Sequence, residues 1–258
     1  MEYLLSAVTD IGICKPKNED SLLVKKAMCD KNAVVLAVLC DGMGGLKKGE
    51  LASASLVRAF SKWFEEKMPE ILLSFFDERE LWSSWGGLIE EMNQKIAAYG
   101  KKNGLQLGTT VTAMLFFQEK YYFVHVGDCR IYELKDTIVQ ITKDQTLVQR
   151  EVDRGNLLPE QAERDARRSV LLQCVGASEY VNPVYGSGNI CKDAIYVLCC
   201  DGFRHLISRQ EIFEGFHSQN TSDEECMTEQ SKRFIELNKK RGEKDNISVI
   251  VIRIGQEF

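Results

Sequence analysis

Two apolar runs in this chain, AVVLAVLC and AIYVLCC, each end at an aspartate followed by a glycine, Asp41 with Gly42 and Asp201 with Gly202. Runs so rich in Val, Ile and Tyr predict β-strands, and their lack of polar residues indicates that a second sheet or helices cover both faces. One Asp-Gly pair is a common turn signal. Two pairs placed after buried runs suggest a functional site at the strand ends.

Other acids lie immediately before runs with strand character. Glu19 and Asp20 precede SLLV, and Asp245 precedes NISVIVIRI. Because the end of one antiparallel strand lies beside the start of its neighbour, acids of both kinds can meet at one rim of a sheet. Carboxylates gathered there would repel one another unless a cation neutralised them. Oxygen ligands without His or Cys favour Mg²⁺ or Mn²⁺ over zinc, so we expect a metal-dependent site.

The order of strand and helix patterns predicts one layered α+β domain over residues 1–258. Strands are expected at residues 3–8, 21–24, 33–40, 110–117, 121–126, 131–134, 138–141, 194–200 and 246–254. Helical periodicity is found at 49–67, 78–101 and 222–241. Gly86 and Gly87 are expected to weaken or interrupt the second helix. Strands 121–126 and 131–134 are expected to form one hairpin, and 131–134 and 138–141 a second.

Composition narrows the possible functions. The net charge of −5 argues against a general nucleic-acid binder. The first residues, MEYLLSAVTDIG, lack the basic and apolar regions of a signal peptide, and no apolar run approaches the ~20 residues that span a bilayer. The nine cysteines lack metal-binding spacing, and several fall in apolar runs, where they behave as core residues. We therefore expect a cytoplasmic protein.

Six short motifs occur in a fixed order: NED at 18–20, LCDGMGG at 39–45, GTT at 108–110, VGDCR at 126–130, CDG at 200–202 and DNIS at 245–248. Together they resemble the PP2C-type (PPM) serine/threonine protein phosphatases, and most closely the compact bacterial members. Each motif alone is weak, but six in order are specific, and the resemblance runs from residue 12 to residue 252. It implies a central antiparallel β-sandwich flanked by pairs of α-helices, a four-layer α-β-β-α arrangement.

The resemblance also implies a set of ligands for Mn²⁺ or Mg²⁺. By motif position, Asp41 would bridge two cations. Asp201 and Asp245 would complete one of the two sites. The carbonyl of Gly42 and the side chain of Glu19 would serve the other site, partly through water. Loss of Asp41 is therefore expected to remove most activity.

Further residues take roles from the same resemblance. Asp20 would hold metal-bound water, and Asp128 matches the acid that binds a third, weaker cation in bacterial relatives. Lys15 stands where the family usually has an arginine that grips the substrate phosphate, so its charge is kept but the bidentate fork is lost. Gln145 replaces a histidine that is frequent in relatives. Met43 is typical of bacterial members, and packing is its expected role.

The implied activity is hydrolysis of phosphoserine and phosphothreonine by direct attack of a hydroxide that bridges the two cations. The alternative is a PP2C-fold regulator, weak or inactive as a catalyst, that binds phosphoproteins. Loss of a core acid would favour this alternative, yet Asp41, Asp201 and Asp245 are all present. The expected partners are phosphorylated proteins, substrates of a Ser/Thr kinase, and that kinase itself. We expect signalling by a monomer, without nucleic acid or membrane.

Overall fold

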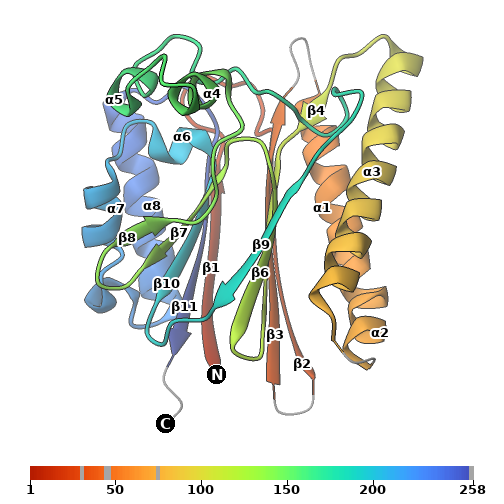
Figure 1. The fold of residues 1–258 in the computed structure, drawn as a ribbon. Coiled ribbons are helices and arrows are strands. Elements are labelled where there is room, and N and C mark those ends of the chain that lie inside the picture. The colour runs from red at the N-terminus through yellow and green to blue at the C-terminus, as the bar shows by residue number, and fades with distance from the viewer. Residues whose placement is uncertain (30–31, 44–47, 74–75, 256–258) are drawn as a thin grey trace.

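Two antiparallel sheets form the centre of the molecule (Figure 1). The computed structural model describes residues 1–29, 32–43, 48–73 and 76–255. One sheet has the order β1-β11-β10-β7-β8, and the other has the order β2-β3-β5-β6-β9 with β4 paired to β3. The strands of the first sheet are β1 (Glu2–Asp10), β7 (Arg130–Leu134), β8 (Ile138–Gln140), β10 (Ile195–Cys199) and β11 (Ile247–Gly255). Those of the second are β2 (Asp20–Cys29), β3 (Asn32–Met43), β4 (Gly108–Thr109), β5 (Val111–Phe117), β6 (Lys120–Val126) and β9 (Val184–Asn189).

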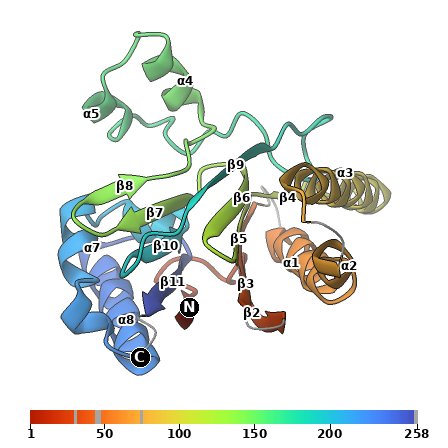
Figure 2. The same cartoon turned by 60° about the horizontal axis from the view of Figure 1, so that its bottom comes forward.

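Helices cover the outer face of each sheet (Figure 1). The sheet that contains β3 carries α1 (Gly49–Glu66), α2 (Met68–Leu73) and α3 (Glu78–Asn103). The facing sheet carries α6 (Asp201–Arg204), α7 (Arg209–Gly215), the 3₁₀ helix η1 (Ser218–Thr221) and α8 (Glu224–Arg241). The short helices α4 (Leu147–Asp153) and α5 (Pro159–Ala162) stand apart from both sheets, as Figure 2 shows. This arrangement confirms the predicted four-layer α+β architecture.

The strand β3 shows why the core sits where it does. Its side chains alternate between two buried clusters. Val35 and Leu39 pack in the cluster that includes the facing sheet. Leu36 and Val38 pack in the cluster that includes Leu56 of α1. The apolar run is therefore covered on both faces, as predicted, and it is buried up to Cys40.

One of the two predicted hairpins is wrong. The strand β6 pairs with β5 and β9, whereas β7 pairs with β10 and β8. Residues 127–129 therefore carry the chain from one sheet to the other. The Gly-Asp signal predicts that the chain changes direction, but it does not determine which sheet the next strand joins. The second hairpin, between β7 and β8, is confirmed.

Glycines account for two further differences from the sequence-based predictions. The helix α3 is continuous through Gly86 and Gly87. A Cβ atom at Gly86 would lie 2.8 Å from the hydroxyl of Tyr185, so this residue allows close packing of α3 on β9. The strand β9 has the sequence VYGSGN, whose glycines weaken strand propensity, so sequence patterns do not predict this strand.

No helix in the described part of the chain combines the length and apolarity needed to cross a bilayer.

Candidate functional site

Four aspartates from both sheets gather at one end of the sandwich. Asp20 begins β2 and lies directly opposite Asp41 in the β2–β3 register. Asp201 follows β10, and Asp245 precedes β11, the antiparallel neighbour of β10. Charge interactions connect Asp41 with the other three aspartates, which places the pairs from the two sheets within reach of one another. The structure therefore brings together side chains that are separated by up to 225 residues in the chain.

Backbone contacts fix the position of Asp41. Its N–H group donates to the hydroxyl of Thr110 over 2.9 Å. Its carbonyl accepts hydrogen bonds from the Thr110 N–H group at 2.9 Å and from the Thr109 hydroxyl at 3.0 Å. The GTT motif thus holds the end of β3 in place. This leaves the carboxylate of Asp41 as the part of the residue that is available for chemistry.

Gly42 and Glu19 meet beside the first turn of α1. The N–H group of Gly42 donates to the carbonyl of Glu19 at 3.1 Å. A Cβ atom at Gly42 would lie 2.5 Å from the carbonyl oxygens of both Glu19 and Gly49, so only glycine fits here. The Glu19 carboxylate accepts a hydrogen bond from the N–H group of Gly49 at 2.9 Å. Gly44 and Gly45, the last residues of the LCDGMGG motif, lie outside the described residues.

Burial and the charges of neighbouring carboxylates both disfavour ionisation of Asp20 and Asp41. Burial, followed by the charges of Asp201 and Asp245, raises the pKa of Asp20 to about 7. The pKa of Asp41 is raised well above its usual range by burial and then by the charge of Asp20 and its neighbours. A positive charge placed among the carboxylates would relieve this repulsion.

The donor set fits a hard divalent cation in its chemistry. Both carboxylate oxygens of Asp20 and the Oδ1 atom of Asp201 are buried without a hydrogen-bond partner among the described residues. Such unpaired buried oxygens are costly unless something satisfies them. Within the same residues, no three or more His, Cys, Asp or Glu side chains already stand in an arrangement that could hold a metal ion. A cation bound among these carboxylates would satisfy the unpaired oxygens.

Lys15 places a positive charge on the edge of the cluster. Its Nζ atom lies 2.7 Å from Oδ1 of Asp245. Burial lowers the pKa of Lys15, but the hydrogen bond and charge of Asp245, with smaller contributions from Asp41 and Glu19, outweigh burial and raise it. The loop that carries Lys15 is tied to β11, because the side chain of Asn246 donates to the carbonyl of Ile11 at 2.9 Å. Lys15 therefore faces the aspartates as a permanent cation.

Two residues that the sequence analysis did not assign support Asp201 and Asp245. His205 lies with Nε2 3.4 Å from Oδ2 of Asp201 and with Nδ1 3.5 Å from Oε2 of Glu243. Glu243 also accepts a hydrogen bond from the backbone N–H group of Asp245 at 3.0 Å. Glu243 precedes the DNIS motif by two residues. An acid at this position was the feature of the sequence that could have indicated a role at the site.

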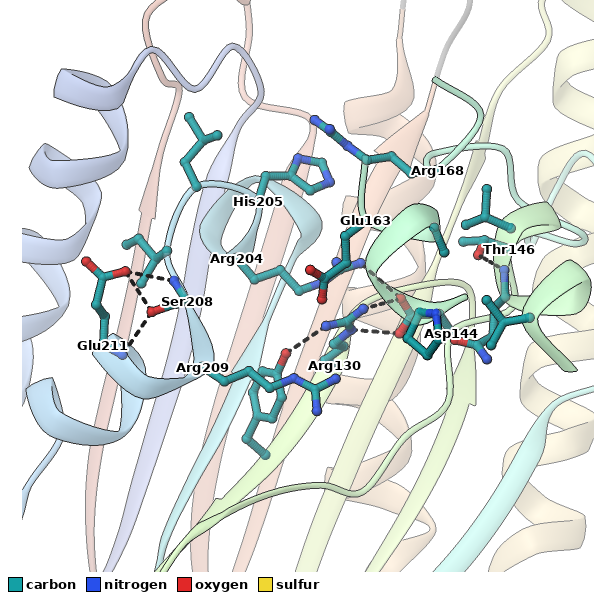
Figure 3. Close-up of a pocket in the computed structure, with 18 residues that line it drawn as sticks. Arg130, Asp144, Thr146, Glu163, Arg168, Arg204, His205, Ser208, Arg209 and Glu211 are labelled. Carbon is teal, nitrogen blue, oxygen red and sulfur yellow. Dashed lines mark hydrogen bonds and ion pairs between the residues drawn. The ribbon is translucent and has the colours of Figure 1, made fainter. Parts of the chain in front are cut away.

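Asp128 interacts with the charge of Asp201 and contacts a buried arginine. The guanidinium of Arg204 lies 3.6 Å from Oδ2 of Asp128 and 3.3 Å from Oδ2 of Asp144. Arg130 binds both oxygens of Asp144, at 2.8 and 2.7 Å. Figure 3 shows Arg130, Asp144 and Arg204 together in the wall of a pocket of about 450 Å³ between the α4–α5 segment and the α6–α7 segment.

The residues that follow β8 take structural roles. Thr146 caps α4, because its side chain accepts a hydrogen bond from the N–H group of Gln149. Gln145 accepts a hydrogen bond from the N–H group of Gly127 at 2.9 Å and donates to the carbonyl of His125 at 3.3 Å. Gln145 therefore supports the turn that presents Asp128.

Comparison with known proteins identifies the family. The sequence model of the family described as protein phosphatase 2C matches residues 16–173. The chain belongs to this family. The resemblance predicted from the six motifs is therefore confirmed.

Individual members of the family show how far the likeness extends. Serine/threonine protein phosphatase PstP of Mycobacterium tuberculosis is 32% identical over 249 residues, which are 95% of this chain but 44% of that protein. The chain thus spans less than half the length of this relative. Serine/threonine phosphatase Stp of Listeria innocua is 29% identical over 255 residues, covering 95% of this chain and 93% of that protein. The crystal structure of the catalytic domain of PstP with two manganese ions matches with a TM-score of 0.80 and 30% identity, over 99% of this chain and all of that one.

Proposed function

We propose that this protein phosphatase 2C family member is a metal-dependent protein serine/threonine phosphatase, with residues 1–258 acting as one catalytic domain. The observation that carries the proposal is the gathering of Asp20, Asp41, Asp201 and Asp245 from both sheets at one end of the sandwich. The names of the bacterial relatives, which are serine/threonine phosphatases, support the same reaction.

Different acids at this end of the sandwich would bind each of two divalent cations. Asp41 is central to the cluster and would contact both cations. Asp201 and Asp245 would complete one site, and Glu19 with the carbonyl of Gly42 would serve the second. The manganese ions bound by PstP support Mn²⁺ as a cofactor here, and the oxygen donors suit Mg²⁺ as well. When bound, such a pair of cations supplies a water activated near neutral pH and positive charge opposite the phosphate oxygens.

The remaining residues would orient the reactants. The carboxylate of Asp20 lacks a protein hydrogen-bond partner among the described residues, so it is free to accept hydrogen bonds from a water molecule. Lys15 would bind the phosphate of the substrate, because its Nζ atom already lies at the edge of the aspartate cluster. A lysine offers a point charge in place of the two parallel N–H donors of an arginine, so its grip on the phosphate would be weaker.

The substrates would be phosphorylated proteins, including substrates of a Ser/Thr kinase and the kinase itself. We expect the chain to act in the cytoplasm as a signalling phosphatase. The assignment of phosphorylated proteins as substrates is supported by the names of the relatives, which are serine/threonine phosphatases.

Hydrolysis of a phosphothreonine peptide in the presence of Mn²⁺, Mg²⁺ or EDTA tests this function directly. We expect activity only with a divalent cation. Asp41→Asn should lose at least roughly 100-fold in kcat/KM, because a ligand that bridges two charges contributes several kcal/mol. A matched control is Asp136→Asn, which changes an exposed acid in the β7–β8 turn.

Two outcomes would contradict the proposal. Activity that persists in EDTA would exclude metal dependence. A folded wild type that binds Mn²⁺ but hydrolyses none of several phosphopeptides would instead favour a phosphoprotein-binding regulator. A small aryl phosphate tested beside the peptide distinguishes a protein phosphatase from a general phosphoester hydrolase.

A further inference from the structure

Asp128 belongs to the predicted ligand set and has a buried arginine as its partner within the fold. It is 4% exposed and lies in the connection between β6 and β7. Its carboxylate interacts with the charge of Asp201, so it borders the aspartate cluster. The family resemblance predicts a third, weaker cation at this position. Whether such a cation fits depends on what else contacts the Asp128 carboxylate.

Arg204 occupies the space beside Asp128. It is the last residue of α6, three residues after Asp201, and its side chain is 11% exposed. Its Nη2 atom donates to the backbone carbonyl of Asp128 at 3.0 Å and lies 3.6 Å from the Asp128 carboxylate. The same atom lies 3.3 Å from Asp144. Three contacts on one nitrogen fix the guanidinium between the two acids, as Figure 3 shows for the Asp144 side.

Asp144 has a second cationic partner besides Arg204. Both oxygens of Asp144 already accept hydrogen bonds from Arg130, and Gln140 donates a further one at 3.2 Å. Arg204 therefore shares its charge between Asp144 and Asp128, while Arg130 supplies a second positive charge to Asp144. The formal charges of two arginines and two aspartates therefore sum to zero without any metal ion; these residues are Arg130, Arg204, Asp128 and Asp144.

From this geometry we propose that Arg204 takes the place of a third cation beside Asp128, so that the carboxylate site of this chain binds two divalent cations and not three. An arginine keeps its charge at every physiological pH, so the guanidinium cannot make room by losing a proton. A divalent cation at Asp128 would meet a fixed positive charge a few ångströms away in a buried setting, where repulsion is strong. The inference rests on the proposed function, since it assumes two cations at the other acids.

Counting the bound Mn²⁺ ions tests this inference without reference to activity. Equilibrium dialysis at millimolar Mn²⁺, or the electron paramagnetic resonance signal of free Mn²⁺, gives the number of ions per chain. We expect two ions for the wild type and two for Asp128→Asn. Arg204→Met should bind three, and the double variant Arg204→Met with Asp128→Asn should return to two. Asp144 keeps its two bonds to Arg130 in Arg204→Met, which favours folding of this variant.

Arg209→Met is the matched control. Arg209 lines the same pocket but contacts Gln140 and the ring of Tyr132 and not Asp128, so this variant should bind two ions. A wild type that binds three ions, one of which is lost in Asp128→Asn, would overturn the inference while leaving the proposed function intact, and this comparison decides even if Arg204→Met fails to fold. Two ions in a folded Arg204→Met would also overturn it. A wild type that binds no Mn²⁺ would remove the proposed metal centre and the inference together.

Discussion

Asp20 combines burial with the charges of two neighbouring carboxylates. It is 8% exposed, and its pKa is raised from 3.8 to about 7. Between these two values the folded chain binds more protons than the unfolded chain. Raising the pH through this window therefore lowers the free energy of unfolding, because ionisation must then occur inside the fold.

Replacement of Asp20 by asparagine should remove this pH dependence. In the presence of a chelator, Asp20→Asn is expected to match the wild type near pH 4 and to be more stable by roughly 2–4 kcal/mol above pH 7. Urea unfolding of both proteins at several pH values measures the difference. The exposed control Asp136→Asn should follow the wild type throughout. A constant difference between Asp20→Asn and the wild type at all pH values would show that Asp20 does not titrate in this window.

At the scale of the element, the two adjacent glycines of α3 have different surroundings. A Cβ atom at Gly86 would lie 2.8 Å from the Tyr185 hydroxyl, whereas one at Gly87 would meet nothing within 4 Å. Both residues lie inside a continuous helix, where glycine costs about 1 kcal/mol relative to alanine. Only Gly86 gains a packing contact in return, because it brings α3 close to β9.

Alanine substitutions at these two positions form a matched pair. Gly87→Ala should raise the free energy of unfolding by about 1 kcal/mol, because the added methyl group is exposed and helix propensity improves. Gly86→Ala should raise the free energy of unfolding by less than this, or lower it, because the Tyr185 side chain must move to make room. Denaturant unfolding of both variants measures the difference. Equal stabilisation by the two substitutions would show that the contact between α3 and β9 contributes nothing.

Sequence patterns predicted those elements that can be recognised from a short run of neighbouring residues. The strand β3 contains one long apolar run, and Asp41 follows this run directly within the strand, so both the strand and the position of its acid could be predicted. The strand β9 could not be predicted from sequence patterns. Its glycines are explained only by their close contacts with aromatic rings of β6. Arg204 could not be assigned either. Its contacts with Asp128 and Asp144 form only after residues 60 and more positions apart are brought together by both sheets.

For the whole molecule, the aspartate cluster lies where the two sheets meet. Asp20 and Asp41 belong to the sheet of β2 and β3, while Asp201 and Asp245 flank strands of the facing sheet. Repulsion among these acids acts between the layers at one end of the sandwich, and the shared apolar core resists it. A cation bound by acids from both sheets would join the layers at this end, so metal binding should stabilise the fold as a whole.

Thermal unfolding with and without Mn²⁺ measures this coupling. A ligand that binds only the folded state adds about 2.7 kcal/mol at a hundredfold excess over its Kd, which for a chain of this size corresponds to a Tm increase of roughly 5–10 °C. Asp41→Asn should lose most of the increase, because Asp41 is the acid that interacts with all the others. It should also have a higher Tm than the wild type in chelator, since asparagine lacks the carboxyl group whose ionisation the fold disfavours. Asp136→Asn should retain the full increase. If Mn²⁺ raised the Tm of Asp41→Asn as much as that of the wild type, the ion would bind elsewhere, and the aspartate cluster would not be what joins the two sheets.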